Sequence, residues 1–545
     1  MSVARVLSRG EFGLDAPLVQ VEVHLGAGLP TFAIVGLPER VVRESRERVR
    51  AALLNSGYEF PSRRITVNLA PVELAKQGGR FDLPIALGLL AASGQLQPRA
   101  SDTIECYGEL GLAGELKPVA GLFLAALHAS RAGHALIVPG ANAAEVGLSG
   151  HAAAYGAAHL RAAAAALGSA TLSSTGPSGA SVLPRSLAPG LCLIAGPDAA
   201  ADDTLVDAQR AGSATAPSLA DVVGQWQAKR ALMIAAAGAH SVLMTGPPGS
   251  GKSMLAARLP SLLPPLSRAE ALEVAGIAAL SGERLDPRRW RARPFRCPHH
   301  TASAHAIVGG GPGVRPGEIS LAHQGVLFLD ELPEFDRRVL EALREPLESG
   351  TITIARAARC LTLPARFQLI AAMNPCPCGY LGDTLQECRC SPARVERYRQ
   401  RVSGPLLDRI DIRLTVPGLP PAQLLQAGGI EELREGEVPR EGGSQHAGPQ
   451  GAAHVCAARA RRLTRSGVLC AFLPAAELRR CCTLRREAQL LLRRSCQRLA
   501  ISARGMQRLL ALSLTIADLA DSDTIEAAHI AEAIQLRRPF QARRQ

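Results

Sequence analysis

The stretch Gly246-Pro247-Pro248-Gly249-Ser250-Gly251-Lys252-Ser253 lies between a strand-like run, 241–245, and a helix-like run, 254–259. Glycines at this spacing let a backbone wrap a phosphate with its N–H groups, and a helix N-terminus behind them favours negative charge. In such a loop the lysine reaches the β- and γ-phosphates and the serine ligates Mg²⁺. An ordinary glycine turn is the alternative, but the strand–loop–helix setting favours a nucleotide site and predicts ATP and Mg²⁺ as cofactors.

Composition sets the lysine of this loop apart. The chain has 61 lysines and arginines in 545 residues, but only four of them are lysines: Lys76, Lys117, Lys229 and Lys252. Arginine is the cation nearly everywhere else. The glycine-rich loop therefore holds the compact ammonium that phosphate-binding loops use.

The charge balance indicates an anionic partner. The 61 basic residues outnumber the 48 acidic ones, a formal net charge of +13, and residues 451–545 hold seventeen arginines against seven acids. Such an excess is typical of nucleic-acid contact, but solvated helix faces produce it too, and composition leaves both readings open.

The length predicts more than one domain, with aliphatic cores because only 3% of the residues are aromatic. The first residues alternate between polar and apolar without a long apolar run, so neither a signal peptide nor a membrane span is expected. Thirteen cysteines without a secretory signal favour a reducing compartment, here the cytoplasm.

Residues 1–170 are predicted to form a compact α/β domain, with strands over 19–24 and 65–69 and helices over 38–55 and 82–92. Residues 171–218, rich in Ser, Ala, Gly and Pro, are predicted to be a linker with a short strand near 191–195.

Two segments of the first domain resemble the peptidase domain of Lon-type proteases. They are Lys76-Gln-Gly-Gly-Arg-Phe-Asp-Leu-Pro-Ile-Ala-Leu and Gly108-Glu-Leu-Gly-Leu-Ala-Gly-Glu-Leu-Lys-Pro-Val-Ala-Gly-Leu-Phe. That peptidase uses a Ser–Lys dyad, in which the lysine takes the serine proton. This chain has Phe81-Asp82 in place of the serine and Phe123 in place of the lysine, while Lys117 stands elsewhere in the motif. The resemblance implies a retained fold without peptidase chemistry.

Residues 219–424 carry a second motif that an ATPase requires. Val326-Leu-Phe-Leu-Asp-Glu331 is an apolar strand that ends in two acids. Asp330 is expected to hold Mg²⁺ through water, and Glu331 to polarise the attacking water. A buried strand that ends in acids is common by chance, but one that follows a phosphate loop in the same domain is not.

Two further polar residues follow in the order that an ATP site needs. Asn374 ends the apolar run 367–373 and can orient the attacking water. Arg409, within Pro405-Leu-Leu-Asp-Arg-Ile-Asp411, precedes the next strand and can reach a neighbouring subunit's γ-phosphate as an arginine finger. Each alone would be assigned as a capping Asn or a surface Arg, but their order and strand placement favour the ATPase roles.

Four cysteines form two close pairs, Cys376-Pro-Cys378 and Cys388-Arg-Cys390. Four thiolates can close tetrahedrally on Zn²⁺, which predicts a structural zinc knuckle at 376–390, although the Cys-x-Cys spacing is tighter than usual. Four free thiols or a redox pair are the alternatives. His299-His300 beside Cys297 lacks further spaced ligands, which favours a packing or polar-network role.

With these motifs in place, residues 219–424 resemble the magnesium-chelatase branch of AAA+ ATPases, and the whole chain resembles the ComM/YifB family of Mg-chelatase-like proteins. The stretches that carry the wider resemblance are Val21-Glu-Val-His-Leu, Ile34-Val-Gly-Leu-Pro-Glu, Arg43-Glu-Ser-Arg, Arg64-Ile-Thr-Val-Asn-Leu-Ala-Pro, Phe295-Arg-Cys-Pro-His-His-Thr, Pro316-Gly-Glu-Ile-Ser-Leu-Ala-His and Leu332-Pro-Glu-Phe.

The resemblance implies an α/β protein with an inactive Lon-like N-terminal domain, an AAA+ core, a linker or long loop over 425–451 and a helical lid over 452–545. Arg504, behind a helix cap at Ser502, matches the second sensor of this class, and Arg508 fits less well. The loop 309–318 and the hairpin 348–356, with Arg315 and Arg356, match insertions that face a central pore, although solvated loops explain them equally.

The implied function is a ring-forming, hexameric, DNA-dependent ATPase, a branch-migration helicase that acts on single-stranded or branched DNA as incoming DNA is integrated in natural transformation. A magnesium-chelatase subunit that remodels a protein partner is the first alternative, and an ATP-dependent peptidase is the second. DNA-stimulated ATP hydrolysis separates the first alternative from the motor, and the missing dyad argues against the second.

Overall fold

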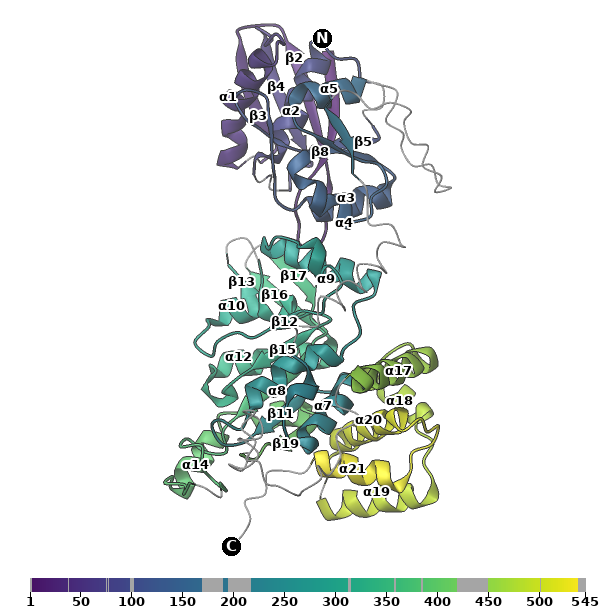
Figure 1. Cartoon of the computed structure of the whole chain (residues 1–545). Helices are drawn as coiled ribbons and strands as arrows, with labels where there is room; N and C mark the ends of the chain where they lie inside the picture. The colour runs from purple at the N-terminus through teal and green to yellow at the C-terminus, as the bar shows by residue number, and fades with distance from the viewer. Residues whose placement is uncertain are drawn as a thin grey trace, which may run out of the picture. The chain divides into compact units, whose positions relative to one another are not determined.

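The structure is a computed structural model that describes residues 2–37, 39–74, 76, 78–98, 102–168, 190–194, 217–311, 315–356, 359–383, 386–418, 449–499 and 501–537. The chain divides into two units (Figure 1), residues 1–211 with 268–291, and residues 212–267 with 292–545. Most residues of the linkers expected at 171–218 and 425–451 lie outside the described part of the chain.

The N-terminal unit is built on a mixed sheet of eight strands among the described residues, in the order β10-β9-β8-β5-β1-β2-β4-β3. Strands β1, β2 and β4 pair antiparallel, whereas β1–β5, β5–β8, β8–β9 and β3–β4 are parallel. The strands are β1 (Ser2–Arg9), β2 (Leu18–Gly26), β3 (Thr31–Val35), β4 (Arg64–Ala70), β5 (Ile104–Cys106), β8 (Ala135–Pro139), β9 (Ala154–Ala157) and β10 (Leu191–Leu193), beside the small pair β6 (Glu109–Leu110) and β7 (Leu116–Lys117).

Alternating apolar residues place one face of this sheet against the helices. Val19, Val21 and Val23 of β2 are fully buried, and α2 is apolar around its whole circumference, so nearly all of its residues lie in the core. The helix predicted over 82–92 is confirmed. The helices are α1 (Arg40–Asn55), α2 (Asp82–Ala92), α3 (Leu122–Ala132), α4 (Ala143–Leu148) and α5 (Leu160–Gly168).

The positions that resemble the peptidase dyad are closed off by packing. Phe81 and Phe123 are 1% and 0% exposed. Asp82 is buried and accepts hydrogen bonds of 2.7 and 3.1 Å from Arg48, and its burial raises its pKa to about 6 against the opposing effect of Arg48. Lys117 is exposed on β7. Phenylalanine can neither attack a carbonyl nor accept a proton, and both phenylalanines lie in the core of this unit.

A segment from the middle of the chain belongs to the N-terminal unit. Helix α9 (Arg268–Ser281) contacts α3, and Trp290 packs edge-on against Phe123 with ring centroids 6.3 Å apart. The sequence alone assigned this segment to residues 219–424. It leaves the second unit after the phosphate loop and returns before β12, so the chain passes between the two units more than once.

The second unit contains a parallel sheet of five strands among the described residues, in the order β12-β15-β18-β11-β19. In parallel sheets, polar groups that follow neighbouring strands meet at the carboxyl edge. The loops after β11, β15 and β18 carry the predicted ATPase residues, so this edge positions the site. The strands are β11 (Val242–Thr245), β12 (Phe295–Arg296), β15 (Val326–Leu329), β18 (Gln368–Met373) and β19 (Ile412–Thr415).

Short helices and two hairpins surround this sheet (Figure 1). The hairpins are β13–β14 (Gly309–Gly310, Arg315–Pro316) and β16–β17 (Thr351–Arg356, Arg359–Pro364). The helices are α7 (Trp226–Gly238), α8 (Lys252–Arg258), α10 (Ala304–Val308), α11 (Glu318–Leu321), α12 (Arg337–Ala342), α13 (Pro346–Ser349), α14 (Pro392–Arg399) and α15 (Gly404–Arg409).

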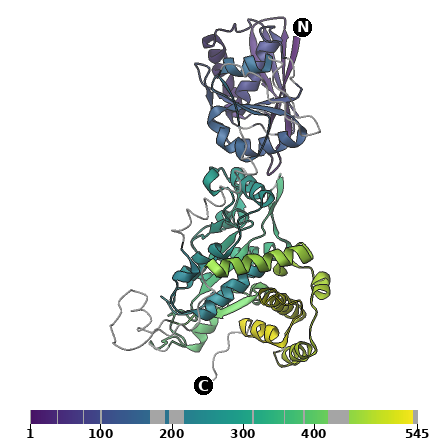
Figure 2. The ribbon, with the colours of Figure 1, turned by 45° about the vertical axis from the view of Figure 1, so that its right-hand side comes forward.

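The C-terminal part of this unit is helical, as predicted, and α17 and α20 pack on α7 (Figure 2). Asp411 fastens it to the sheet, because its buried carboxylate lies 3.2 Å from Arg508 of α20 and 3.3 Å from His240. Although burial opposes ionisation, Arg508 and His240 lower the pKa of Asp411 to about 2. The helices are α17 (Pro449–Ser466), α18 (Ala475–Cys481), α19 (Arg486–Leu499), α20 (Ala503–Leu519) and α21 (Ala527–Leu536).

Candidate nucleotide-binding site

The glycine-rich loop joins β11 to α8 with two residues in the left-handed region. Gly249 has φ 75° and Gly251 has φ 87°, values that residues with a side chain rarely adopt. A side chain at Gly246 would collide with the carbonyl group of Val416 beyond β19. These glycines therefore let the backbone turn sharply and pass close to the neighbouring strand.

Lys252 lies across this loop. Its Nζ donates hydrogen bonds to the carbonyls of Gly246 and Pro247, at 2.9 and 2.8 Å, and to Asn374 Oδ1 at 3.3 Å. The side chain is buried, and burial lowers its pKa against the opposing charges of Asp330 and Glu331. An incoming phosphate would replace these neutral acceptors with charged oxygens. The structure thus brings the predicted lysine and the predicted sensor Asn374 together.

The two expected magnesium ligands also meet. Ser253 Oγ donates to Asp330 Oδ2 at 2.5 Å, and Asp330 Oδ1 accepts from the backbone N–H of Glu331 at 2.9 Å. A hydroxyl and a carboxylate are hard oxygen ligands of the kind Mg²⁺ prefers, so Ser253 and Asp330 would hold the ion here. The residues fit the metal that the motif implies.

Glu331 has an unusual backbone and a partner that sequence reasoning missed. Its φ of 53° and ψ of 47° lie in the left-handed region, which is uncommon for a residue with a side chain and often marks functional sites. His300 Nδ1 lies 3.3 Å from Glu331 Oε2. The His299 and His300 rings lie tilted against each other with centroids 4.2 Å apart, and the Phe335 ring forms a T-shaped contact with His300. The expected polar role of the histidine pair thus involves the predicted catalytic carboxylate.

A cavity of about 340 Å³ lies between these groups. The residues that line it are Pro248, Gly249, Gly251, Lys252, Ser253, Met254, Asp330, Glu331, Met373 and Asn374. Five of the predicted site residues therefore share one cavity with part of the glycine-rich loop. Neither Arg409 nor Arg504 is among the described residues that line it.

Arg409 and Arg504 instead meet each other at Glu348. Arg409 ends α15 with its side chain buried, and its guanidinium lies 2.6 Å from Glu348 Oε1. Arg504 pairs with the same oxygen. Arg504 stands in the first turn of α20, where Ser502 accepts a hydrogen bond from the N–H of Gly505 at 3.0 Å, so the predicted helix cap is confirmed.

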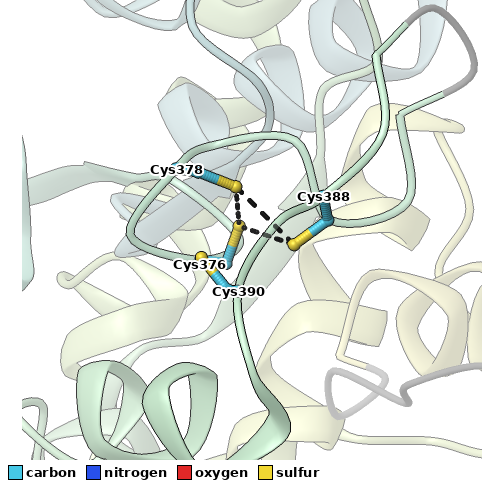
Figure 3. Close-up of side chains that lie close together, drawn as sticks. All are labelled: Cys376, Cys378, Cys388 and Cys390. Atoms are coloured by element: carbon cyan, nitrogen blue, oxygen red, sulfur yellow. Dashed lines mark hydrogen bonds between the residues drawn. The ribbon is translucent and has the colours of Figure 1, made fainter.

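The four clustered cysteines converge (Figure 3), and their sulfurs all lie within 4.8 Å of one another. Cys376 Sγ lies 3.3 Å from Cys378 Sγ and 3.6 Å from Cys388 Sγ. A zinc ion with Zn–S bonds of about 2.3 Å places tetrahedral thiolates about 3.8 Å apart, whereas a disulfide needs about 2.05 Å. None of the four forms a disulfide, and their arrangement fits zinc.

Two details connect this cluster with the nucleotide site. A hydrogen bond from the backbone N–H of Tyr380 lowers the pKa of Cys378 to about 6, so one of the four sulfurs is readily available as a thiolate. A Cβ on Gly379 would lie 2.5 Å from Pro248 Cδ, so the backbone after Cys378 packs directly on the glycine-rich loop. A metal at the cysteines would brace that loop.

Comparisons with known proteins agree with this site. Family models of the magnesium chelatase subunit ChlI match residues 21–142 and 218–424, and a model of the C-terminal part of that subunit matches residues 448–537. A 38 kDa magnesium-chelatase subunit of Cereibacter sphaeroides is 26% identical over 186 residues, which are 28% of this chain and 51% of its own length. Fold, cavity and family models together define the class, a Mg-chelatase-like AAA+ ATPase.

Two longer relatives identify the family within that class. YifB of Salmonella typhimurium is 46% identical over 538 residues, which cover 98% of this chain and 97% of YifB. Competence protein ComM of Haemophilus influenzae is 43% identical over 537 residues, 98% of each chain. The chain belongs to the Mg-chelatase-like family that includes YifB and ComM.

Crossing a bilayer requires a long and apolar helix, and no helix of the described residues is both long enough and apolar enough.

Proposed function

We propose that the chain is an ATP-driven DNA motor that assembles as a hexameric ring in the cytoplasm and catalyses branch migration while incoming DNA is recombined in natural transformation. The observation that carries the ATPase half is the convergence of Lys252, Ser253, Asp330, Glu331 and Asn374 on one cavity. The name of the relative ComM, a competence protein, supports the DNA half.

In this proposal, Lys252 and the loop N–H groups hold the phosphates of ATP, and Ser253 and Asp330 hold Mg²⁺. Glu331 takes up the proton of the attacking water, and Asn374 orients that water. The bound magnesium neutralises the charge that develops on the phosphates. The contact with His300 holds the Glu331 carboxylate in place.

The position of the two arginines supports assembly. Arg409 and Arg504 lie outside the cavity of their own chain and next to each other. An arginine finger supplied by a second subunit explains how a site without its own arginine completes the charge stabilisation of the transition state. A homohexameric ring meets this need for every subunit at once.

Two surfaces support contact with DNA. The hairpins β13–β14 and β16–β17 pack together, since a side chain at Gly309 would meet Ile354, and Arg315 is exposed on the first of them. Arg356 ends β16, and its side chain lies outside the described part. In the helical lid, α19 exposes Arg486, Arg493, Arg494 and Arg498, which form no ion pair with any described residue. Unpaired arginines suit a phosphate backbone of any sequence.

The N-terminal unit is proposed to be a Lon-peptidase-like fold without its dyad, and the cysteine cluster to hold one structural Zn²⁺. The buried Phe81 and Phe123 support the first statement. The sulfur geometry supports the second.

The deciding experiment measures the ATPase rate of the purified chain without DNA and with single-stranded, duplex and branched DNA. The motor predicts a rise with DNA, largest for branched substrates. A rate that DNA leaves unchanged favours the chelatase-like remodeller. ATP-dependent degradation of casein would show that the chain has peptidase activity and would contradict the proposal that the N-terminal unit lacks the catalytic dyad.

A further inference from the structure

Glu348 is the point where two arginines from distant parts of the second unit meet. Its Oε1 lies 2.6 Å from the guanidinium of Arg409 and also pairs with Arg504. Arg409 belongs to the sheet-bearing core and Arg504 to the helical lid. The Glu348 carboxylate therefore links the core to the lid by contacting one arginine of each, and both arginines were expected to contact ATP.

The surroundings of this carboxylate are cationic. Burial lowers the pKa of Arg409, and the charges of Arg344 and Arg508 lower it further. The other contact of the Arg409 guanidinium is a 2.7 Å hydrogen bond to the carbonyl of Pro405, while its Nε has no hydrogen-bond partner among the described residues. Like charges repel, and the Glu348 carboxylate, which contacts both guanidiniums, offsets the repulsion between Arg409 and Arg504, while the charges of Asp408 and Glu341 also favour the charged form of Arg409.

A phosphate offers the same acceptor chemistry as this carboxylate, with more charge. A terminal phosphate that approached Arg409 and Arg504 from a neighbouring subunit would therefore compete with Glu348 for the same nitrogens. The two arginines become available to phosphate when the Glu348 carboxylate moves away.

Glu348 is tied to the β16–β17 hairpin by a rigid turn. Ser349 Oγ donates to the carbonyl of Glu345 at 2.9 Å and accepts from the N–H of Thr351 at 3.2 Å. Gly350 turns the chain with φ 69°, and its carbonyl accepts from Ala365 at 2.8 Å. Because this turn has little freedom, a displacement of the hairpin shifts α13 and the carboxylate that it carries.

We propose that Glu348 is a latch that holds Arg409 and Arg504 away from the neighbouring nucleotide until nucleic acid displaces the β16–β17 hairpin. This inference rests on the proposed motor function and adds the residue that transmits DNA binding to ATP hydrolysis. Glu348 is not among the described residues that line the cavity and acts through the two arginines, so it is a positioning residue.

The first test compares Glu348→Gln with Glu345→Gln in the full chain. Both changes remove one carboxylate from the same short segment, but the Glu345 side chain forms no hydrogen bond or ion pair with any described residue. Glu348→Gln should raise the DNA-free ATPase rate about two- to fivefold, the range of a partly exposed ion pair, and leave the DNA-saturated rate near that of the parent. The stimulation ratio then falls by the same factor, whereas Glu345→Gln keeps the parent ratio.

Two outcomes overturn the latch. One is an unchanged stimulation ratio in Glu348→Gln. The other is an equal loss of both rates, because that pattern belongs to a merely structural residue.

A second readout needs neither DNA nor turnover. In a Glu331→Gln background, which should bind ATP without hydrolysing it, Glu348→Gln should lower the ATP concentration for ring assembly by about two- to fivefold in light scattering. In the presence of Arg504→Ala, the shift caused by Glu348→Gln should be smaller, because the ion pair between Glu348 and Arg504 is already lost. If the effects of the two substitutions on the assembly concentration are fully additive, the latch is contradicted. If DNA does not stimulate the ATPase rate of the parent enzyme, the motor proposal is wrong. The assembly assay uses no DNA, so it still tests whether Glu348 restrains the two arginines.

Discussion

The cavity at the carboxyl edge of the five-stranded sheet and the arginine pair at Glu348 were both expected to contact ATP, Arg409 that of a neighbouring subunit, but they are built differently. The cavity residues follow β11, β15 and β18, so sheet geometry alone brings them together. Arg409 and Arg504 come from a short helix and the lid, and they face an acid of their own chain. The difference supports the proposal that one chain holds the phosphate-binding half of an ATP site and offers its two arginines to a neighbouring subunit.

Removing the arginine half should have the largest effect. Arg409→Ala is expected to lower the rate of ATP hydrolysis about 10³-fold or more, as for other arginine fingers, with ATP affinity nearly kept. Mixing it with inactive Glu331→Gln subunits should restore part of the rate in rings that tolerate dead sites. Arg401→Ala, which removes an exposed surface pair with Glu334, is the matched control. Failure of every mixture to recover activity would place Arg409 outside a shared site.

Changes inside the cavity should separate binding from chemistry. Glu331→Gln removes the group that activates water and should lower kcat by about 10²- to 10⁴-fold while ATP still binds. Lys252→Ala removes the charge that faces the phosphates and should weaken ATP binding itself. Equilibrium binding of a fluorescent ATP analogue and steady-state rates distinguish the two. Parental turnover in Glu331→Gln would refute the assigned role.

The cysteine cluster should affect the cavity by a smaller amount. Metal analysis should find about one Zn²⁺ per chain, and Cys388→Ser with Cys390→Ser should release it. Because Gly379 packs on Pro248, loss of zinc should weaken ATP binding several-fold, whereas Cys192→Ser, an exposed thiol of the other unit, should not. Normal stability and ATP affinity in a metal-free protein purified under reducing conditions would contradict the zinc proposal.

The acid sensitivity of this cluster has a defined sign. The pKa of Cys378 is lowered to about 6, whereas desolvation raises the pKa of Cys390, so the four ligands do not lose their protons at one pH. Zinc must displace the protons that remain on the thiols, so its affinity for the metal-free chain should weaken steadily as the pH falls, which a chromophoric zinc indicator can follow.

The smallest effects should come from the exposed arginines of α19. Replacing Arg493, Arg494 and Arg498 with Ala should reduce the slope of log affinity against log salt by about 0.9 per lost duplex contact. Arg485→Ala, whose side chain pairs with Glu526, should change the slope less. DNA binding that is independent of salt would argue against a motor that tracks phosphates.

Arg356→Ala, by contrast, should reduce the DNA-stimulated ATPase rate more than the overall DNA affinity and leave the DNA-free rate nearly intact.

Much of this could be predicted because the signals are local. Apolar runs that end in a glycine loop, in Asp330 or in Asn374 fix both the strand and the residue at its end, and α2 matches its predicted bounds over 82–92. The cysteine cluster was also predictable, since its members lie within fifteen residues of sequence and need only one tight loop.

The side-chain contacts of the candidate site could not be predicted from the sequence. Glu348 meets residues 61 and 156 positions further along the chain, and nothing in its own surroundings marks it as their partner. His300 faces Glu331 only because β12 pairs with β15. The segment 268–291 carries no sequence signal that assigns it to either unit, so its place in the N-terminal unit depends on packing that periodicity does not encode.

The scarcity of lysine has a consequence for labelling chemistry. Lys76, Lys229 and Lys252 are buried, whereas Lys117 is exposed in the other unit from the cavity. General acylating reagents should therefore modify the folded chain at one side-chain amine. A nucleotide that carries an acyl phosphate would deliver its acyl group to Lys252 instead. Because few other lysines can react, the acylation of Lys252 measured by peptide mass mapping would report how much of the cavity is occupied by nucleotide.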